Sequence, residues 1–322
     1  MKMKILIFVL CLTFTTCMSQ NSGCPSKEDI KPCTCLIGVN KKPWISCEGL
    51  NSATELQNVL KRMQNYKFTT FNIEKSNLGV LPADIFSDVQ IQFLNIMFTN
   101  LTRLSDDLNK PPFLGLESSL EAIEIQDGFT DEEFPLVRLS LSHLKKMTLL
   151  QLEGNILPTI SNDWFESGPY RLRELHLLDT YAKQLGSHVF SSLSELRKLS
   201  LTGGHISELT RNMFPSPAIY LESLDLNNNK LAILPNDMFY RMPSLKEVFL
   251  ENNDFTKIDE VVFAPVWSQI SHVFFYGNPL NCNADMKWIY KYRIPESIQG
   301  HCASPPSLRY RSLSNLTITD FE

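Results

Sequence analysis

The chain has 322 residues, a formal net charge of −5 at pH 7, and 43% hydrophobic and 20% charged residues. This balance excludes a disordered chain and a bundle of membrane spans, and the weak negative charge gives no indication of nucleic acid as a partner. The length allows one large core or about two average domains.

Residues 1–19 have the pattern of a secretory signal peptide. Lys2 and Lys4 precede the apolar run ILIFVLCLTF, and cleavage after Ser19 would leave Gln20 as the new start. A membrane anchor is the alternative, but the run is short for a span. There is no other long apolar segment, and the polar end argues against a lipid anchor. The sequence predicts a secreted, extracellular protein with no membrane span.

Six cysteines follow the predicted signal peptide. They lie in two clusters: Cys24, Cys33, Cys35 and Cys47, then Cys282 and Cys302. An even number clustered at both ends of a secreted chain predicts disulfides. Zinc is the alternative, but spacings of 9, 2 and 12 residues do not match the paired C-x-x-C of zinc sites. Sequence alone allows three pairings of the first four cysteines.

Residues 20–65 form the predicted amino-terminal cysteine cap and a helix. Leu56, Val59, Leu60 and Met63 recur at helical spacing. Ser52 or Thr54 is suited to cap the start of this helix.

Residues 66–277 contain eight to nine copies of one pattern. In its clearest copy the pattern comprises Leu221, Leu224, Leu226, Asn229 and Leu231, and it recurs 24 residues later. Across the nine copies the starts are 23 to 29 residues apart. A period of 20–29 residues with this spacing is typical of a leucine-rich repeat and predicts a stacked solenoid.

Each repeat is expected to form one coil of the solenoid. The L-x-L core predicts a short strand with alternating faces, and the asparagine amide can satisfy backbone groups of neighbouring coils. The asparagine is present in only four of the nine copies, and Ser, Thr or Gly replaces it elsewhere. We therefore expect less regular stacking in those coils, mostly in the amino-terminal half.

A phenylalanine stands eighteen residues after the first position in six repeats, which predicts a column of rings under the convex face. These residues are Phe86, Phe165, Phe190, Phe214, Phe239 and Phe263. Asn109 and Arg138 break the column in the two longest repeats, where Phe113 can fill one gap. The irregular residues 105–119 and 128–143 are either functional loops or degenerate repeats.

The two ends of the chain carry a resemblance. The order C-P…C-x-C…C at residues 24–47 and the segment NPLNCNADMKWIYKYR are similar to the caps of extracellular leucine-rich repeat proteins. The resemblance implies an α/β fold: a curved right-handed solenoid with short parallel strands on the concave face and disulfide-bonded caps. It implies the pairs Cys24–Cys35 and Cys33–Cys47. In the carboxy-terminal cap, residues 278–322, Ala284 replaces the second cysteine, so we infer a single remaining bridge, Cys282–Cys302.

No catalytic motif is present, and the six histidines are scattered. We therefore expect a protein that is not an enzyme and has no cofactor and no metal. The carboxylates look spread rather than convergent, which disfavours calcium.

The candidate binding surface is the concave sheet, whose outward positions carry nine acidic and two basic residues. The predicted partner is another extracellular protein with a basic patch, held by the acids and by apolar groups at both ends. The alternative is a solvated face without a partner. The candidate residues are Phe93, Phe98, Glu124, Asp127, Glu153, Glu174, Asp179, Asp225, Phe249, Glu251, Phe274 and Tyr276.

Two sequons predict glycans at Asn100, expected to point outward at a strand exit, and at Asn315. Two other functions remain open. The first cap and its helix resemble arthropod secreted repeat proteins, which implies a non-catalytic, stabilising subunit of a secreted oxidoreductase of the luciferin monooxygenase type. The other is an immune or pattern recognition protein. The sequence does not indicate the oligomeric state.

Overall fold

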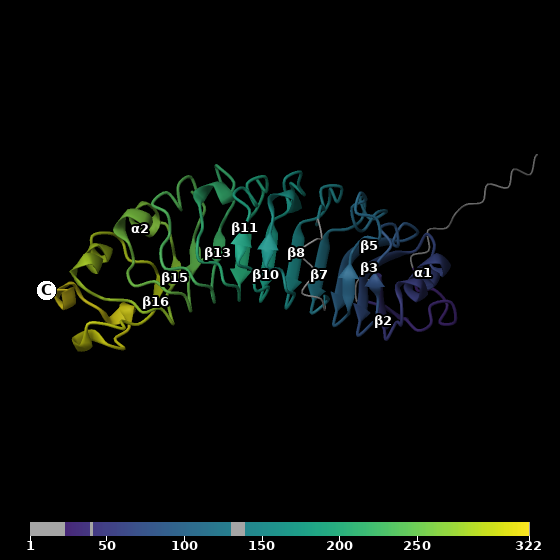
Figure 1. The fold of residues 1–322 in the computed structure, drawn as a ribbon, viewed down its shortest axis with the longest axis horizontal. Coiled ribbons are helices and arrows are strands. Elements are labelled where there is room, and N and C mark those ends of the chain that lie inside the picture. Colours follow the sequence, from purple (N-terminus) through teal and green to yellow (C-terminus); the bar gives the residue numbers. More distant parts are fainter. Residues whose placement is uncertain (1–22, 39–40, 130–138, 322) are drawn as a thin grey trace, which may run out of the picture.

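The computed structural model describes residues 23–38, 41–129 and 139–321. Within them the chain forms a shallow arch, with the strands in single file from β2 near one end to β16 near the other (Figure 1). The predicted signal peptide, residues 1–19, lies outside the described residues, as does Arg138 of the predicted ring column.

One long sheet runs the length of the arch. Its spatial order is β1-β2-β3-β5-β7-β8-β10-β12-β13-β14-β15-β16, and every pairing is parallel except β1 with β2. The strands are β1 (Thr34–Ile37), β2 (Pro43–Glu48), β3 (Lys67–Glu74), β5 (Gln90–Met97), β7 (Ala122–Gln126), β8 (Leu149–Glu153), β10 (Glu174–Leu178), β12 (Lys198–Thr202), β13 (Ser223–Asp225), β14 (Glu247–Phe249), β15 (His272–Phe274) and β16 (Ser297–Gln299).

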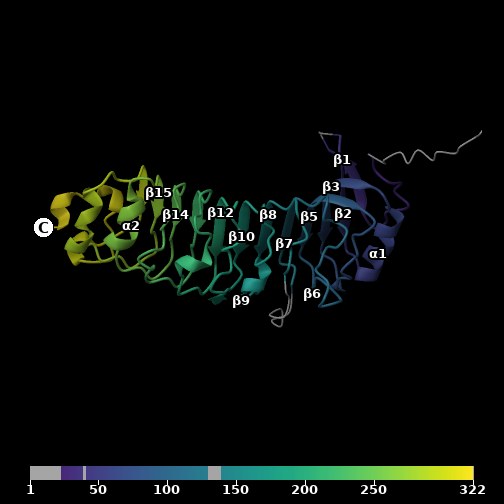
Figure 2. The ribbon, with the colours of Figure 1, turned by 90° about the horizontal axis from the view of Figure 1, so that it is seen from above.

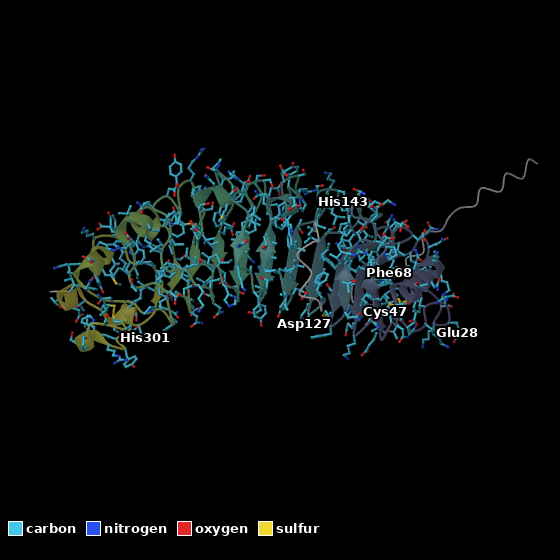
Figure 3. All side chains as sticks on the ribbon, viewed as in Figure 1. Glu28, Cys47, Phe68, Asp127, His143 and His301 are labelled. Carbon is cyan, nitrogen blue, oxygen red and sulfur yellow. A yellow bond between two sulfur atoms is a disulfide. The ribbon has the colours of Figure 1, made fainter. Side chains whose placement is uncertain are left out.

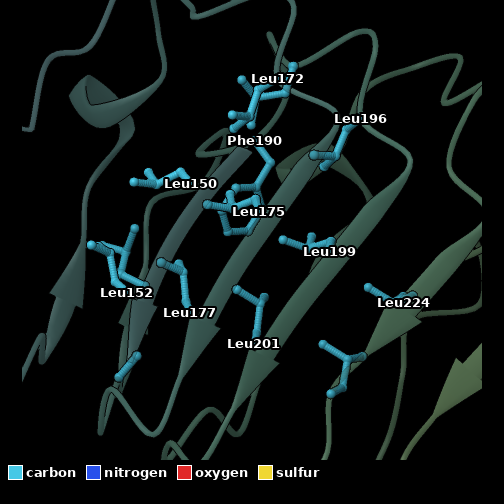
Figure 4. Close-up of a cluster of buried hydrophobic side chains, with 14 of the residues drawn as sticks. Leu150, Leu152, Leu172, Leu175, Leu177, Phe190, Leu196, Leu199, Leu201 and Leu224 are labelled. Atoms are coloured by element: carbon cyan, nitrogen blue, oxygen red, sulfur yellow. The ribbon is translucent and has the colours of Figure 1, made fainter. Parts of the chain in front are cut away.

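Each repeat contributes one strand to this sheet at the same register. Leu175 of β10 pairs with Leu150 on one side and Leu199 on the other, and Figure 4 shows these leucines side by side in the core. Along β8 and β10 buried and half-exposed residues alternate. A single coil has no second layer for its leucines, so the apolar interior exists only because the coils stack.

The phenylalanine column lies inside the coils, as predicted, and Phe113 is part of it. All its members are buried. Ring centroids lie 5.3 to 6.2 Å apart in the pairs Phe86–Phe113, Phe165–Phe190, Phe190–Phe214 and Phe239–Phe263. In these four pairs a ring packs on a ring of the next coil and helps to set the spacing of the convex side.

The repeat asparagines bond to neighbouring coils, as predicted. Asn229 is buried; its Nδ2 donates to the carbonyl of Leu201 at 2.7 Å and its Oδ1 accepts from the Ile206 amide at 3.2 Å. Where asparagine is absent, Ser76 Oγ accepts from the Leu50 amide at 3.0 Å, and Thr99 Oγ1 donates to Gly128 at 3.0 Å. Small hydroxyls therefore replace part of the amide's function.

For the long sheet the expectation of less regular stacking in the amino-terminal half is wrong, although on the flank the pairing of residues 79–80 with 101–103 does have a register shift. Strands β3 and β5 have eight residues each and pair in register, whereas β13, β14 and β15 have three. The physical reason is composition: KFTTFNIE and QIQFLNIM are rich in β-branched and aromatic residues, which favour extended backbone.

The convex side and the flanks hold short elements. The α-helices are α1 (Ala53–Arg62) and α2 (Glu260–Trp267). Two small sheets, β4 (Gly79–Val80) with β6 (Leu101–Arg103) and β9 (Thr159–Ile160) with β11 (Gln184–Leu185), are separate from the long sheet, and Figure 2 shows β6 and β9 on one flank of the arch. The 3-10 helices are η2 (Asn162–Trp164), η3 (Arg211–Met213), η4 (Ala284–Tyr290), η5 (Pro306–Leu308), η6 (Leu313–Asn315) and η7 (Ile318–Phe321).

Two caps cover the ends of the core. Helix α1 begins after Ser52, whose side chain accepts from the Glu55 amide at 3.1 Å, so Ser52 is the cap residue. At the other end, residues 284–290 form the 3-10 helix η4, and the Nε1 of its buried Trp288 donates to the Ile258 carbonyl at 2.9 Å. The disulfides are Cys24–Cys35, Cys33–Cys47 and Cys282–Cys302, as the cap resemblance implies.

Candidate functional site

The concave face of the long sheet consists of three rows of outward side chains, because the parallel strands are in register. The first row is Trp44, Thr70, Phe93, Ala122, Leu149, Glu174, Lys198, Ser223, Glu247, His272 and Ser297. The middle row is Ser46, Asn72, Asn95, Glu124, Gln151, His176, Ser200, Asp225, Phe249, Phe274 and Gln299. The last row is Glu48, Glu74, Met97, Gln126, Glu153, Leu178 and Thr202.

Two predicted acids meet at the middle of this face. Gln151 Nε2 donates to Glu124 Oε1 at 3.2 Å and to Glu153 Oε2 at 3.0 Å, so one amide joins carboxylates of two strands. Burial, and secondarily the charge of Glu153, raise the pKa of the Glu124 carboxyl. Two carboxylates so placed give the centre of the face a negative potential.

Glu174 belongs to a second polar cluster on the next strands. Its Oε2 lies 3.4 Å from His176 Nε2 and its Oε1 lies 3.3 Å from Lys198 Nζ. His176 Nδ1 lies 3.0 Å from Ser200 Oγ. Lys198 therefore compensates part of the Glu174 charge, and this carboxylate attracts a cation less strongly than Glu153 does.

Asp225 and Glu251 continue the acidic region toward the carboxy-terminal end. Asp225 Oδ1 accepts from the Asn227 amide at 3.0 Å, and Asn227 Nδ2 donates to Glu251 Oε2 at 3.2 Å. Burial raises the pKa of the Asp225 carboxyl, although its bond from Asn227 and the nearby His176 act in the opposite direction. The carboxylates of Asp225 and Glu251 are thus held in place by hydrogen bonds.

Aromatic residues follow the acids on the last strands. The rings of Phe249 and Phe274 meet edge to face with centroids 5.2 Å apart. The ring centroid of Tyr276 lies 5.1 Å from that of His301 in the carboxy-terminal cap. Half-exposed rings on a rigid sheet are the kind of group that dominates interface energy.

At the amino-terminal end the apolar groups extend further than the sequence predicted. Phe93 is half-buried in the first row, in register with Thr70 and Ala122. In the same row Trp44 is 43% exposed, and Leu36, its partner across the β1–β2 pair, is 61% exposed. Sequence reasoning assigned both residues to the cap alone. The alternation of Pro43, Ile45 and Cys47 inward was the available signal that Trp44 faces outward.

Three predicted residues lie at the exit of the strands rather than on the sheet. Phe98, Asp127 and Asp179 occupy one position that has a left-handed backbone in every coil, with φ of 52°, 44° and 50°. A side chain at Gly154 would overlap the Asp127 carboxylate, and a side chain at Gly203 would overlap the Asp179 carboxylate. The two aspartates therefore lie across the backbone of the following coil, whereas Phe98 is 51% exposed.

The two sequons differ in their surroundings. Asn100 was expected to point outward, but it is half-buried, its Oδ1 accepts from the Leu78 amide at 2.9 Å, and its Nδ2 donates to Asn77. Asn315 is exposed in the carboxy-terminal cap. The inter-coil bonds of Asn100 explain why it does not extend freely into solvent.

No metal-binding group of side chains is found in the part of the chain that the structure describes. It contains no group of three or more His, Cys, Asp or Glu side chains suited to a metal ion. His143, whose pKa is lowered by burial, and Asp127 lie at opposite margins of the arch (Figure 3). Among the described residues no helix is long and apolar enough to span a membrane.

Comparison with known proteins agrees with this architecture. A family model described as leucine rich repeat matches residues 219–266. The Toll chain in the Drosophila Toll–Spatzle complex superposes with a TM-score of 0.60 over 75% of this chain, at 19% identity. With repeats, a shared parallel sheet and cysteine-bonded caps, the chain has the fold of a leucine-rich repeat solenoid.

Its similarity to one relative covers almost the whole sequence. The non-catalytic subunit of Oplophorus-luciferin 2-monooxygenase from Oplophorus gracilirostris is 23% identical over 92% of this chain and 87% of that protein. The leucine-rich repeat-containing G-protein coupled receptor 4 of Mus musculus is 29% identical over 38% of this chain. The chain spans only 12% of that receptor and 32% of the Toll chain.

Proposed function

We propose that the chain is a secreted, non-enzymatic protein that holds another extracellular protein on its concave face. The observation that carries the proposal is the middle of that face, where Gln151 joins Glu124 to Glu153 between two apolar ends. The acids are fixed on strands, so a ligand would not have to order them on binding, which lowers the cost of association.

The chemistry of the face defines the partner. Its centre suits lysine or arginine side chains, and a partner with a basic patch would be attracted over a distance comparable to the Debye length. The ends suit apolar side chains, with Phe93 and Trp44 on one side and Phe249, Phe274 and Tyr276 on the other. Phe98, Asp127 and Asp179 extend the proposed contact to the strand exits.

The test begins with capture of the partner by cross-linking the native secreted protein and identifying what is bound. Affinity for that partner is then measured for the variant with Glu153→Lys and Glu174→Lys. Asp225 is left unchanged because its carboxylate bonds to the backbone. The matched control reverses two exposed glutamates away from the concave face, Glu166→Lys and Glu208→Lys.

We expect the concave variant to lose at least about tenfold in affinity and most of the salt dependence, since two close charges of reversed sign each cost about a kcal/mol or more. The control variant should bind within about twofold of the wild type. Equal affinity for the concave variant and the wild type would show that the partner binds elsewhere.

A second candidate is a stabilising, non-catalytic subunit of a secreted oxidoreductase. The supporting observation is the similarity to the luciferin monooxygenase subunit, which covers 92% of this chain. Its test is co-purification of an oxidoreductase with the native protein, followed by the half-life of that enzyme's activity with and without the chain. An unchanged half-life would remove this candidate and leave the general binding function standing.

A further inference from the structure

A pocket separate from the concave face lies where the first strands of the sheet begin. It has a volume of about 400 Å³ and is open to solvent. It is lined by Lys41, Lys42, Pro43, Lys67, Phe68, Thr69, Gln90, Ile91, Gln92, Ser118, Ser119, Glu121 and Lys146. Four lysines thus surround one pocket in a chain whose net charge is −5.

The solenoid register brings these lysines together. Lys67 pairs with Gln90 at the start of β3 and β5. Ser119 and Lys146 precede Ala122 and Leu149 by the same three positions, and those two residues are themselves in register. Lys67 and Lys146 therefore stand at one edge of the sheet, three strand spacings or about 14 Å apart.

Three of the four lysines are available for a ligand. Within the described residues Lys41, Lys67 and Lys146 are exposed and form no ion pair. Further along the same edge two arginines are paired with carboxylates: Arg173 lies 3.6 Å from Glu195, and Arg197 lies 2.8 Å from Glu222. Three lysines that have no carboxylate partner among the described residues therefore line this one pocket.

The polar lining of the pocket is also available. The one lining carboxylate, Glu121, accepts from Gln92 Nε2 at 3.0 Å. In the described part of the chain, the side chains of Thr69, Gln90 and Ser118 make no hydrogen bond to protein, although each reaches solvent. Hydroxyl and amide groups between spaced ammonium groups can bond both the hydroxyls and the anionic groups of a sugar.

We propose that this pocket binds a sulfated sugar chain. A ligand with anionic groups repeated along its length matches charges spread over about 14 Å better than a single phosphate does. Single-stranded nucleic acid is disfavoured because its bases need exposed rings for stacking. Phe68, the only ring among the lining residues, is 3% exposed.

The experiment uses the full secreted chain and heparin as the probe, with binding measured at low and at physiological salt. The pocket variant is Lys67→Gln with Lys146→Gln, and the matched control is Lys183→Gln with Lys230→Gln, two exposed lysines outside the pocket. Desulfated heparin and a single-stranded polynucleotide are compared as ligands. Circular dichroism of each variant verifies that the fold is retained.

We expect heparin affinity to fall about tenfold in the pocket variant, because each of the two exposed lysines contributes only a small part of the binding free energy. Heparin affinity of the control variant should change less than about twofold. Desulfated heparin should bind weakly, and added salt should reduce binding by the wild type more than by the pocket variant. Absence of heparin binding at low salt, or equal losses in the two variants, overturns the proposal. A polynucleotide that binds as tightly as heparin and is lost in the same variant overturns the assignment to a sugar.

Discussion

The repeat asparagine of the seventh coil provides the sharpest test of how neighbouring coils are held together. Asn229 Nδ2 donates to the carbonyls of Leu201, Leu226 and Asn227 at 2.7, 3.1 and 3.1 Å, and its Oδ1 accepts from the Ile206 amide at 3.2 Å. The side chain is buried. Asn229→Ala removes all four bonds at once and leaves the backbone groups they served inside the protein.

The magnitude follows from the two groups on the neighbouring coil. The Ile206 amide and the Leu201 carbonyl lose their side-chain partner, and each buried group left unsatisfied costs about 1–3 kcal/mol. We therefore expect Asn229→Ala to lower the free energy of unfolding by about 3–4 kcal/mol, near the upper end for a single substitution.

The assay is urea unfolding followed by far-UV circular dichroism without reductant, so that the caps stay bonded. Asn212→Ala is the matched control, because Asn212 is an exposed asparagine of the preceding turn and the same atoms are removed. It should change the free energy by less than about 0.5 kcal/mol. A loss below about 1 kcal/mol for Asn229→Ala, or an equal loss for the control, would refute the reasoning.

Three further outcomes are expected. The pKa of Glu124 is raised in the folded chain, so its ionised form destabilises the fold. Glu124→Gln should therefore raise the free energy of unfolding at pH 7 by less than about 1 kcal/mol. Near pH 4, below the ordinary carboxyl pKa of 4.5, urea titration should give nearly the same free energy of unfolding for the variant and the wild type. Replacing Cys282 and Cys302 by Ala opens a loop of 20 residues and should cost about 3 kcal/mol, with protease cleavage appearing first in that cap; unchanged cleavage would contradict it. Because Asn315 is exposed and Asn100 bonds to Leu78, we expect a glycan at Asn315 and none at Asn100. Glycan-removing amidase should then lower the mass of the secreted protein, and Asn315→Gln should abolish that mass shift. Of the two substitutions, only Asn100→Gln should lower the thermal midpoint of unfolding.

Much of the fold is predictable from the sequence because stacking imposes one rule on every coil. Positions such as Leu175, Leu199 and Leu224 must be apolar to be buried, so the period is visible without any coordinates. The ring column is visible for the same reason, and it even predicts that Phe113 closes a gap after an insertion. The three disulfide pairs came from the resemblance of the caps and not from spacing.

The surface was less predictable, because an outward position obeys no packing rule. Trp44 belongs to the concave face only because β2 pairs in parallel with β3, a tertiary contact that the cap pattern does not indicate. Asp127 and Asp179 were placed on the sheet by counting, but their left-handed backbone places them at the strand exits. The asparagine position alone underestimates how regularly the amino-terminal strands pair, because residues such as Phe93 also favour extended backbone.

The lysine pocket could be predicted from the sequence only in part. Lys41 and Lys146 are far apart in the sequence, and only the register of the sheet makes them neighbours. The signal was nevertheless available, since Lys67 and Lys146 both stand one residue before the first apolar position of a repeat. Aligning the polar positions of the repeats as carefully as the apolar ones would have revealed it.

The alternation of inward and outward side chains in strands such as β8 and β10 places two different constraints on one strand. Inward side chains such as those of Leu150 and Leu175 pack against the coils on both sides, so a substitution at one of them must fit its neighbours. Outward positions such as Gln151 and His176 can be exchanged one coil at a time without disturbing the interior. Outward positions can therefore differ while the fold is kept, as in the Toll chain, which superposes with a TM-score of 0.60 at 19% identity.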